Sequence, residues 1–243
     1  MRQRNMAVSH PLQSAEEAFF AGQDIVEVVR DDFTQMTVSS TVDLLPWFAT
    51  LDSGTAVISD DGAGGLLVVT THTDDNDFVN VQLNGESIKL AAGKRASFRS
   101  RAKVDDADTT NFFIGFAITD AEILNASGTG AGTVTDAIGF ANIAGSVYCV
   151  SSKNGSTTWN VVAQDSGLDM VDATFRTFEL EFDGIGGVTW KIDGNTVHTI
   201  SDTATTITLY PDDEAMTPTI EVQNTDASAE VLTVDYYAAY QER

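Results

Sequence analysis

The chain has little cysteine and no long apolar run. Its 243 residues include one cysteine, Cys149, so no disulfide can form within the chain. Because disulfides are rare in proteins that fold in a reducing cytoplasm, we expect folding in the cytoplasm of a host cell. The first residues, MRQRNMAVSHPLQSAEE, lack the apolar segment of a signal peptide. The best apolar run is Leu66–Val69, far short of the ~20 residues that cross a membrane, so we expect no membrane partner.

Positive charge is also scarce. Lys and Arg number 13 against 36 Asp and Glu, which gives a formal net charge of −23. A negative field of this size repels phosphate backbones and argues against nucleic acid as a partner. One interpretation of the charge is solubility. A more specific one is a surface component that is repeated on a particle, where like charges keep neighbouring particles apart.

Motifs of catalysis are missing as well. The three histidines, His10, His72 and His198, lie at unrelated positions and form no zinc-binding motif. There is no G-x-S-x-G sequence, and the glycine-rich stretch 128–132 lacks the Lys-Ser/Thr pair of a phosphate-binding loop. The sequence therefore predicts a protein that is not an enzyme and binds no organic cofactor.

What the sequence does contain is the pattern of β-strands. From Asp24 onward, short runs of alternating apolar residues are separated by Gly, Asp, Asn and Ser, with no helical period between them. Asn84-Gly85, Asp183-Gly184 and Asp193-Gly194 are typical of tight hairpins. The pattern predicts an all-β fold, a two-layer antiparallel β-sandwich. The expected strands are Leu66–Thr71, Phe78–Leu83, Ala96–Val104, Phe112–Ile118, Ala137–Ala141, Val147–Ser151, Trp159–Ala163, Phe175–Phe182, Val188–Ile192, Thr196–Ile200, Thr219–Val222 and Val231–Tyr240.

The same alternation predicts the core. Apolar residues that alternate with charged neighbours should face the opposite sheet, whereas the charged neighbours face solvent. The residues expected to line the core between the two sheets are Phe98, Phe113, Phe140, Phe178, Leu180, Phe182, Trp190 and Ile192.

Four passages point to a known type of sandwich: GGLLVVTTHTDDNDFVNVQL, then GKRASFRSRAKV leading into NFFIGFAITD, then RTFELEFDGIGGVTWKIDGNTVHTI, and last LTVDYYAAYQER. With these passages the stretch from Asp32 to Arg243 resembles the concanavalin A-like lectin/glucanase (laminin-G-like) jelly rolls. The resemblance implies a jelly-roll topology. Such domains occur in virions of tailed bacteriophages, as capsid decoration proteins and fibres, so it also implies a possible structural role there.

The first residues differ from the rest. We expect residues 1–30 to form a short N-terminal arm and residues 31–243 to form the jelly roll. Ser14 and Glu17 have the spacing of a helix capping box, which predicts a short helix or an ordered turn in the arm. The residues of the arm expected to contact a partner are its first two arginines and its two phenylalanines: Arg2, Arg4, Phe19 and Phe20.

Basic residues gather in one place. Six of the 13 fall between residues 89 and 103, and alternation puts four of them on one face: Arg95, Arg99, Arg101 and Lys103. Arg99, Arg101 and Lys103 are therefore candidates for docking an acidic partner. The competing interpretation is a ladder within the chain, in which they oppose Glu179 and Glu181 on a neighbouring strand. Those two glutamates and Asp183 do not follow the order of the glucanase motif Glu-x-Asp-x-(x)-Glu, so we expect no catalytic role for them.

Calcium is an open question in the sequence. Loops at 74–77, 105–108 and 212–214 supply Asp, Asn and Glu oxygens of the kind that Ca²⁺ prefers. None has the spacing of an EF-hand, and Asp is common in turns without a metal.

The leading functional hypothesis is a structural virion protein, a phage capsid decoration or cement protein on the capsid exterior. Its partner would be the major capsid protein or another virion protein, and it would act as a homo-oligomer, for which a trimer is our expectation. The alternative is a carbohydrate-binding module or receptor-binding fibre head that holds a glycan with Trp47 or Trp159. A glycan hydrolase is the third hypothesis.

Overall fold

The computed structural model describes most of the chain from residue 25 onward. The expected arm residues Arg2, Arg4, Phe19 and Phe20, and the capping box at Ser14, lie outside the described residues. Within the described part, strands are the only regular secondary structure, and none of its segments is a helix with the length and apolarity to cross a membrane. The described residues are 25–34, 46–59, 64–120, 122–124, 136–154, 159, 161–201 and 209–243.

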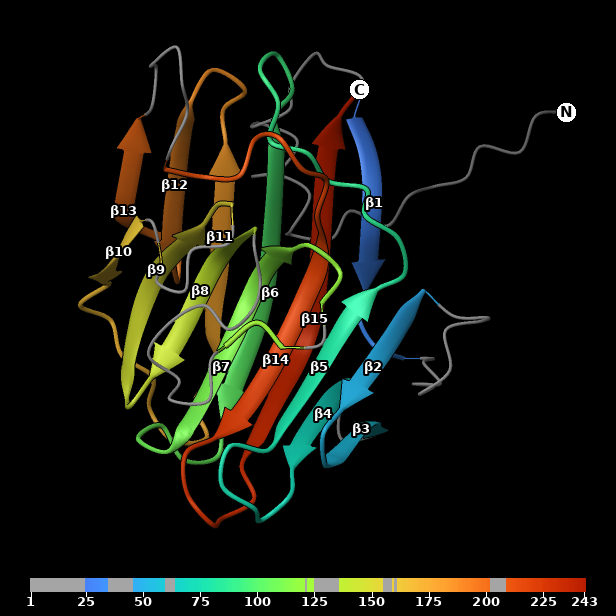
Figure 1. Ribbon diagram of the computed structural model, residues 1–243, viewed down its shortest axis with the longest axis vertical. Helices are drawn as coiled ribbons and strands as arrows, with labels where there is room; N and C mark the ends of the chain where they lie inside the picture. Colours follow the sequence, from blue (N-terminus) through green and yellow to red (C-terminus); the bar gives the residue numbers. More distant parts are fainter. Residues whose placement is uncertain are drawn as a thin grey trace, which may run out of the picture.

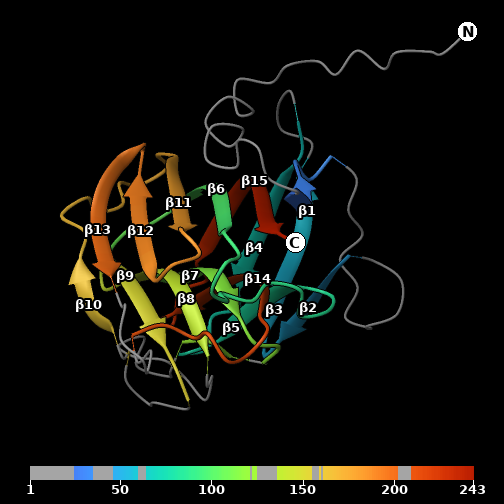
Figure 2. The ribbon, with the colours of Figure 1, turned by 90° about the horizontal axis from the view of Figure 1, so that it is seen from above.

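The strands form two antiparallel sheets that pack face to face, which confirms the predicted sandwich (Figures 1 and 2). The first sheet has eight strands, in the order β13 (Asn195–Ser201), β12 (Gly187–Ile192), β11 (Arg176–Phe182), β6 (Ala96–Val104), β15 (Val231–Glu242), β4 (Leu66–Thr71) and β3 (Gly54–Ser59), with β1 (Ile25–Asp31) also paired to β15. The second has seven, in the order β10 (Val161–Asp165), β9 (Ser146–Ser152), β8 (Ala137–Ile143), β7 (Thr110–Ala117), β14 (Thr217–Asn224), β5 (Phe78–Leu83) and β2 (Trp47–Leu51).

The expected strands are all present, with ends shifted by at most two residues, and three further strands precede them. β1, β2 and β3 were not expected, because charged or small residues interrupt their apolar runs. β1 pairs with β15 from Ile25 to Asp31, so the expected boundary between arm and sandwich at residue 30 falls inside a paired strand.

Two of the three expected hairpins are confirmed. Asp193-Gly194 joins β12 to β13, and Asp183-Gly184 lies in the connection between the paired strands β11 and β12. Asn84-Gly85 is not a hairpin, because β5 and β6 belong to different sheets and the chain crosses between the sheets there. The Asn84 amide donates to the Pro46 carbonyl, and Gly85 has a φ of +96°, which suits glycine at this crossing.

The core prediction is confirmed for all but one residue. Seven of the eight expected side chains are buried between the sheets. Phe113 is buried too, but on the outer face of the seven-stranded sheet, where it packs against Ile123 and Leu124. Its neighbours Phe112 and Ile114 face inward instead. The prediction therefore chose the wrong set of alternate residues on β7.

Truncating Trp190 tests this core. Trp190→Ala removes a fully buried indole and leaves the Gly139 carbonyl, 2.8 Å from its Nε1, without its donor. We expect a loss of about 3–5 kcal/mol in the free energy of unfolding, measured by urea denaturation. Ile185→Ala, at a side chain 77% exposed, is the control and should change it by less than about 0.5 kcal/mol. Equal midpoints for both variants would contradict the assignment.

Candidate functional site

Arg99, Arg101 and Lys103, which we call the basic stripe, lie on the outer face of the eight-stranded sheet. Their side chains contact other side chains of the same chain. The Arg99 Nε is 3.5 Å from Glu179, directly opposite it on β11, and Arg101 pairs with Asp235 at 2.6 Å. Arg101 and Lys103 also lie over the ring of Phe175, at 4.2 and 5.0 Å from its centroid. The Arg99–Glu179 pair matches the ladder interpretation, whereas Arg101 and Lys103 contact Asp235 and Phe175 in place of the expected acidic residues of β11.

Of the two glutamates on β11, Glu181 has a different partner from the one expected. Glu181 is opposite Ser97 and pairs with Lys191 at 2.6 Å, rather than with a residue of the basic stripe. Lys191 lies on β12 opposite Glu179, two residues along from Glu181, and its long side chain reaches the Glu181 carboxylate diagonally. Asp183 accepts the amides of Ile185 and Gly187 at 2.8 Å each, so it shapes the hairpin.

The two tryptophans proposed for sugar binding are not on the surface. Trp47 is 1% exposed and donates from Nε1 to Asp31 at 2.9 Å. Trp159 is 8% exposed and stacks on Phe113, with the ring centroids 6.1 Å apart. Neither ring can form the exposed platform that was expected.

The outer face of the seven-stranded sheet has an apolar half and a polar half. On β7 and β8 the outward residues include Phe113, Ala117 and Ala141, which pack under Ile123 and Leu124. On β5 and β14 the outward residues are polar apart from Phe78, which begins β5. Strand register places these in pairs, Asn80 opposite Glu221 and Gln82 opposite Thr219.

A loop that includes residues 118–120 and 122–124 crosses this face, and the polar side chains hold its backbone. Gln82 donates to the Ile118 carbonyl and accepts from the Asp120 amide, at 3.0 and 3.1 Å. Asn80 donates to the Asp120 carbonyl at 3.0 Å. The Glu221 carboxyl accepts the amides of Ile123 and Leu124, at 2.7 and 2.9 Å. Side chains placed where a ligand would contact the sheet thus bind the chain itself.

Glu221 is the most perturbed carboxyl of this face. Its complete burial raises its pKa to about 8, because the loss of hydration outweighs the lowering by the Leu124 and Ile123 amides, and the Glu122 and Asp120 carboxylates add smaller increases. At neutral pH the group is therefore predominantly protonated. Sequence reasoning missed Glu221, although its outward position in the expected strand Thr219–Val222 was a usable signal.

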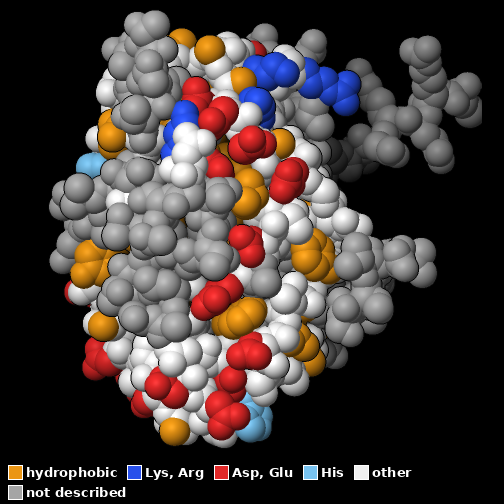
Figure 3. Space-filling model, viewed as in Figure 1, with side chains coloured by type: hydrophobic (Ala, Val, Ile, Leu, Met, Phe, Trp, Pro, Cys, Tyr) orange, Lys and Arg blue, Asp and Glu red, His pale blue; other side chains and the backbone are white. Residues whose placement is uncertain are grey.

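Beside the loop, a strip of the face stays accessible. We call it the acidic strip, and its residues are Phe48, Asp52, Phe78, Asp120 and Glu122, all partly or fully exposed. Burial raises the pKa of Glu122, and the nearby Asp120 and Asp52 carboxylates raise it further. Figure 3 views this side, where acidic side chains follow one another with hydrophobic ones between them.

Gln223 lies at the inner margin of the acidic strip, opposite Phe78 in the register of β14 and β5. Its Nε2 is 3.3 Å from Glu122, and its Oε1 is buried without a hydrogen-bond partner. A buried acceptor of this kind is uncommon and is satisfied by a donor from water or a ligand.

A cleft of about 570 Å³ opens at the other end of β5. Its lining residues include Asn84, Glu86, Lys94, Gln241 and Arg243. No aromatic ring lines it. Its apolar lining is aliphatic, from Val28 and Leu83, whereas the acidic strip combines aromatic rings with carboxylates.

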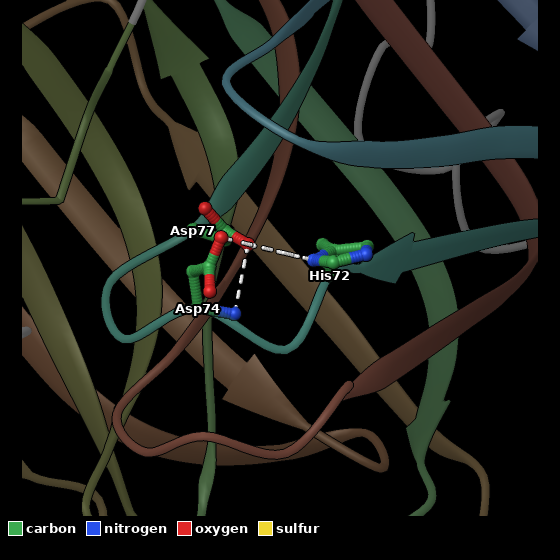
Figure 4. A group of neighbouring side chains, drawn as sticks. All are labelled: His72, Asp74 and Asp77. Carbon is green, nitrogen blue, oxygen red and sulfur yellow. Dashed lines mark hydrogen bonds and ion pairs between the residues drawn. The ribbon is translucent and has the colours of Figure 1, made fainter.

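Two of the three loops considered for calcium use their carboxylates elsewhere. Asp106 accepts the amides of Asp108 and Thr109 within its own turn. Asp212 and Asp213 both pair with Lys153. The third loop brings Asp74 and Asp77 beside His72, and this is the one group of potential metal ligands found among the described residues (Figure 4).

Comparisons with known proteins identify the fold. No family model and no curated protein matches the chain by sequence. The endo-1,3-beta-glucanase from Streptomyces sioyaensis superposes with a TM-score of 0.59 at 14% identity, over 89% of this chain and 96% of that one. The potassium-bound Emp46p carbohydrate recognition domain gives 0.54 at 9% identity, over 88% and 95%. A carbohydrate esterase of the Shiga toxin-encoding bacteriophage phi24B gives 0.51 at 13%, over 89% and 99%.

The chain therefore has the concanavalin A-like lectin/glucanase fold, as the resemblance predicted. At these identities the likeness establishes the fold alone, since such folds carry both enzymes and binding proteins. The phage esterase is the link to bacteriophages among these three, and it gives no support to a capsid role.

The buried Glu221 gives a pH prediction. Its folded pKa, about 8, lies above the unfolded value of 4.5, so only the folded state keeps the proton between these pH values. The contribution of Glu221 to the free energy of unfolding is full below pH 4.5. It falls by about 1.4 kcal/mol per pH unit as the pH rises toward 8. Glu221→Gln should remove this slope between pH 5 and 8, as measured by urea unfolding.

The control for this experiment is Glu214→Gln, because Glu214 is exposed. It should keep the slope of the natural chain. Parallel stability curves for Glu221→Gln and the natural chain would mean that Glu221 does not hold its proton in the folded state.

Proposed function

We propose that the protein binds a glycan on the acidic strip and does not hydrolyse it. The observation that carries the proposal is the pairing of partly exposed rings, Phe48 and Phe78, with the carboxylates of Asp120 and Glu122 on one sheet face. The apolar side of a sugar ring packs on an aromatic ring, while its hydroxyls donate to carboxylates.

The fold supports this proposal without deciding it. Proteins of this fold include a glucanase and a carbohydrate recognition domain, so carbohydrate is a recurrent ligand of the architecture. The glucanase cleaves its carbohydrate, whereas a recognition domain only binds one. The carboxylates of this chain favour binding without cleavage.

The carboxyls of Glu221, Glu179 and Glu181 cannot act as a hydrolytic pair on the acidic strip. A retaining glycosidase needs two carboxyl groups about 5–5.5 Å apart that both reach the sugar. Glu221 cannot reach one, because it is completely buried and both its oxygens accept backbone amides. Glu179 and Glu181 lie on the outer face of the other sheet, paired with Arg99 and Lys191. We therefore propose a binding protein rather than an enzyme.

For the setting of this binding we propose the exterior of a phage virion, with attachment to the capsid or another virion protein as a homo-oligomer. The support is the charge of −23, which suits a repeated surface component. The capsid cement role and the trimer remain predictions of the sequence.

Glycan binding can be tested with β-1,3-glucan and mixed-linkage glucan as probes, by affinity electrophoresis and calorimetry of oligosaccharides. Phe78→Ala should weaken binding of the responding glycan at least tenfold, because a stacking surface is lost. Ile185→Ala, on an exposed hairpin of the other sheet, should leave it unchanged. No reducing ends should be released. If neither Phe78→Ala nor Phe48→Ala alters binding, the glycan does not use this strip.

The virion setting has a separate test. Deleting residues 1–22 leaves every described strand intact, since β1 begins at Ile25. The truncated protein should keep its melting temperature yet co-sediment less with capsids that lack the protein, because it has lost interface area. Equal retention of both forms would place the attachment surface on the sandwich.

A further inference from the structure

The loop between β4 and β5 brings three potential metal ligands together. His72, Asp74 and Asp77 each offer one ligand atom, and all three atoms lie within 4.8 Å of one another. Figure 4 shows the imidazole facing the two carboxylates, which come from the two ends of a short turn. A nitrogen and two oxygens thus converge on one point at the end of the sandwich.

The distances in this group are too long for hydrogen bonds and a few tenths of an ångström longer than those between ligands of one metal ion. His72 Nδ1 is 3.8 Å from the Asp77 carboxylate and 4.0 Å from that of Asp74. Both separations exceed the donor–acceptor distance of a hydrogen bond. Two ligands of a tetrahedral zinc ion at about 2.0–2.2 Å lie about 3.4 Å apart. A small inward movement of the exposed His72 and Asp74 side chains would therefore let both share an ion with Asp77.

The backbone of the loop is fixed from below by the end of β14. The Asn224 side-chain amide donates to the carbonyls of His72 and Asp74, at 2.9 and 2.8 Å. Its backbone amide donates to the backbone carbonyl of Asp77 at 3.2 Å. Asn76 adopts a φ of +68°, a conformation that asparagine tolerates. The ligands therefore start from positions held by the fold, which lowers the entropy lost on binding an ion.

A second observation points to a cation. Asp77 is 5% exposed, and within the described part of the chain its one ion-pair neighbour is the distant His72. Buried carboxylates are normally paired with a cation or bound to a metal. Here the backbone amide of Asp74, at 3.2 Å, provides a single hydrogen bond to Asp77 Oδ2 and no positive charge.

We propose that His72, Asp74 and Asp77 form a binding site for one zinc ion, with water at the remaining position. Imidazole nitrogen favours zinc and its neighbours in the transition series, whereas Ca²⁺ and Mg²⁺ prefer sites built from oxygen alone. Three protein ligands and one open position are a common zinc arrangement. The site is separate from the acidic strip, and the proposal does not depend on glycan binding.

The test is calorimetric titration of the full, tag-free chain with zinc chloride, and in parallel with calcium chloride and magnesium chloride. We expect one zinc ion per chain, bound more tightly than calcium or magnesium, and a melting temperature that rises with zinc. Cys149 should not compete, because it is buried and burial raises the pKa of its thiol to about 12.

Two variants and two controls locate the ion. His72→Ala and Asp74→Asn change exposed side chains, so folding should be unaffected, and each should weaken zinc binding at least tenfold. Asp75→Asn removes the same charge from the same loop without removing a ligand and should bind zinc normally. His198→Ala removes a histidine from β13 and should also bind normally.

The proposal is overturned by any of three results. These are no zinc binding at millimolar concentration, an equal loss in Asp75→Asn and Asp74→Asn, or tighter binding of calcium than of zinc. The second result would mean that general charge attracts the ion, and the third would exclude the imidazole as a ligand.

Discussion

The layer of aromatic side chains between the two sheets is the constraint on which the rest of the molecule depends. Phe98 lies at its centre, with ring centroids at 5.3 Å to Phe116 and 5.6 Å to Tyr237. Trp190 and Tyr237 extend from the eight-stranded sheet and donate to the carbonyls of Gly139 and Gly115 on the other. Because these contacts fix which residues of β7, β8 and β14 face inward, they also fix which residues face out.

One consequence is the burial of Glu221. β14 lies near the middle of the seven-stranded sheet, so an outward glutamate there would ordinarily meet water. The loop that includes residues 118–120 and 122–124 covers it instead, and Ile123 and Leu124 add their side chains to a second apolar cluster around Phe113. The apolar contacts bring the loop down, while the two amides limit the penalty of burying the carboxyl.

The two surfaces proposed for ligands share β5 and its approach. Phe78 begins the strand at the acidic strip, and Asp77 immediately before it belongs to the proposed metal group. Both surfaces depend on β14, which positions Gln223 beside the strip and Asn224 beneath the loop. A single pair of neighbouring strands, β5 and β14, thus positions both proposed sites on one rigid support.

Period-2 alternation is a local property, and it determined the strands, the antiparallel sandwich and most of the core. It did not place Asn84-Gly85 at a crossing between sheets, nor Phe113 on the outer face, because both depend on which strands become neighbours. Glu221 and Ile123 are 98 residues apart in sequence, and their contact decides which carboxyl loses its water. The metal group lies within six residues, yet its convergence rests on Asn224, 152 residues beyond His72. The sequence by itself determined the fold through local pattern, whereas the tertiary structure decided the sites, because burial and convergence arise from contacts between distant segments.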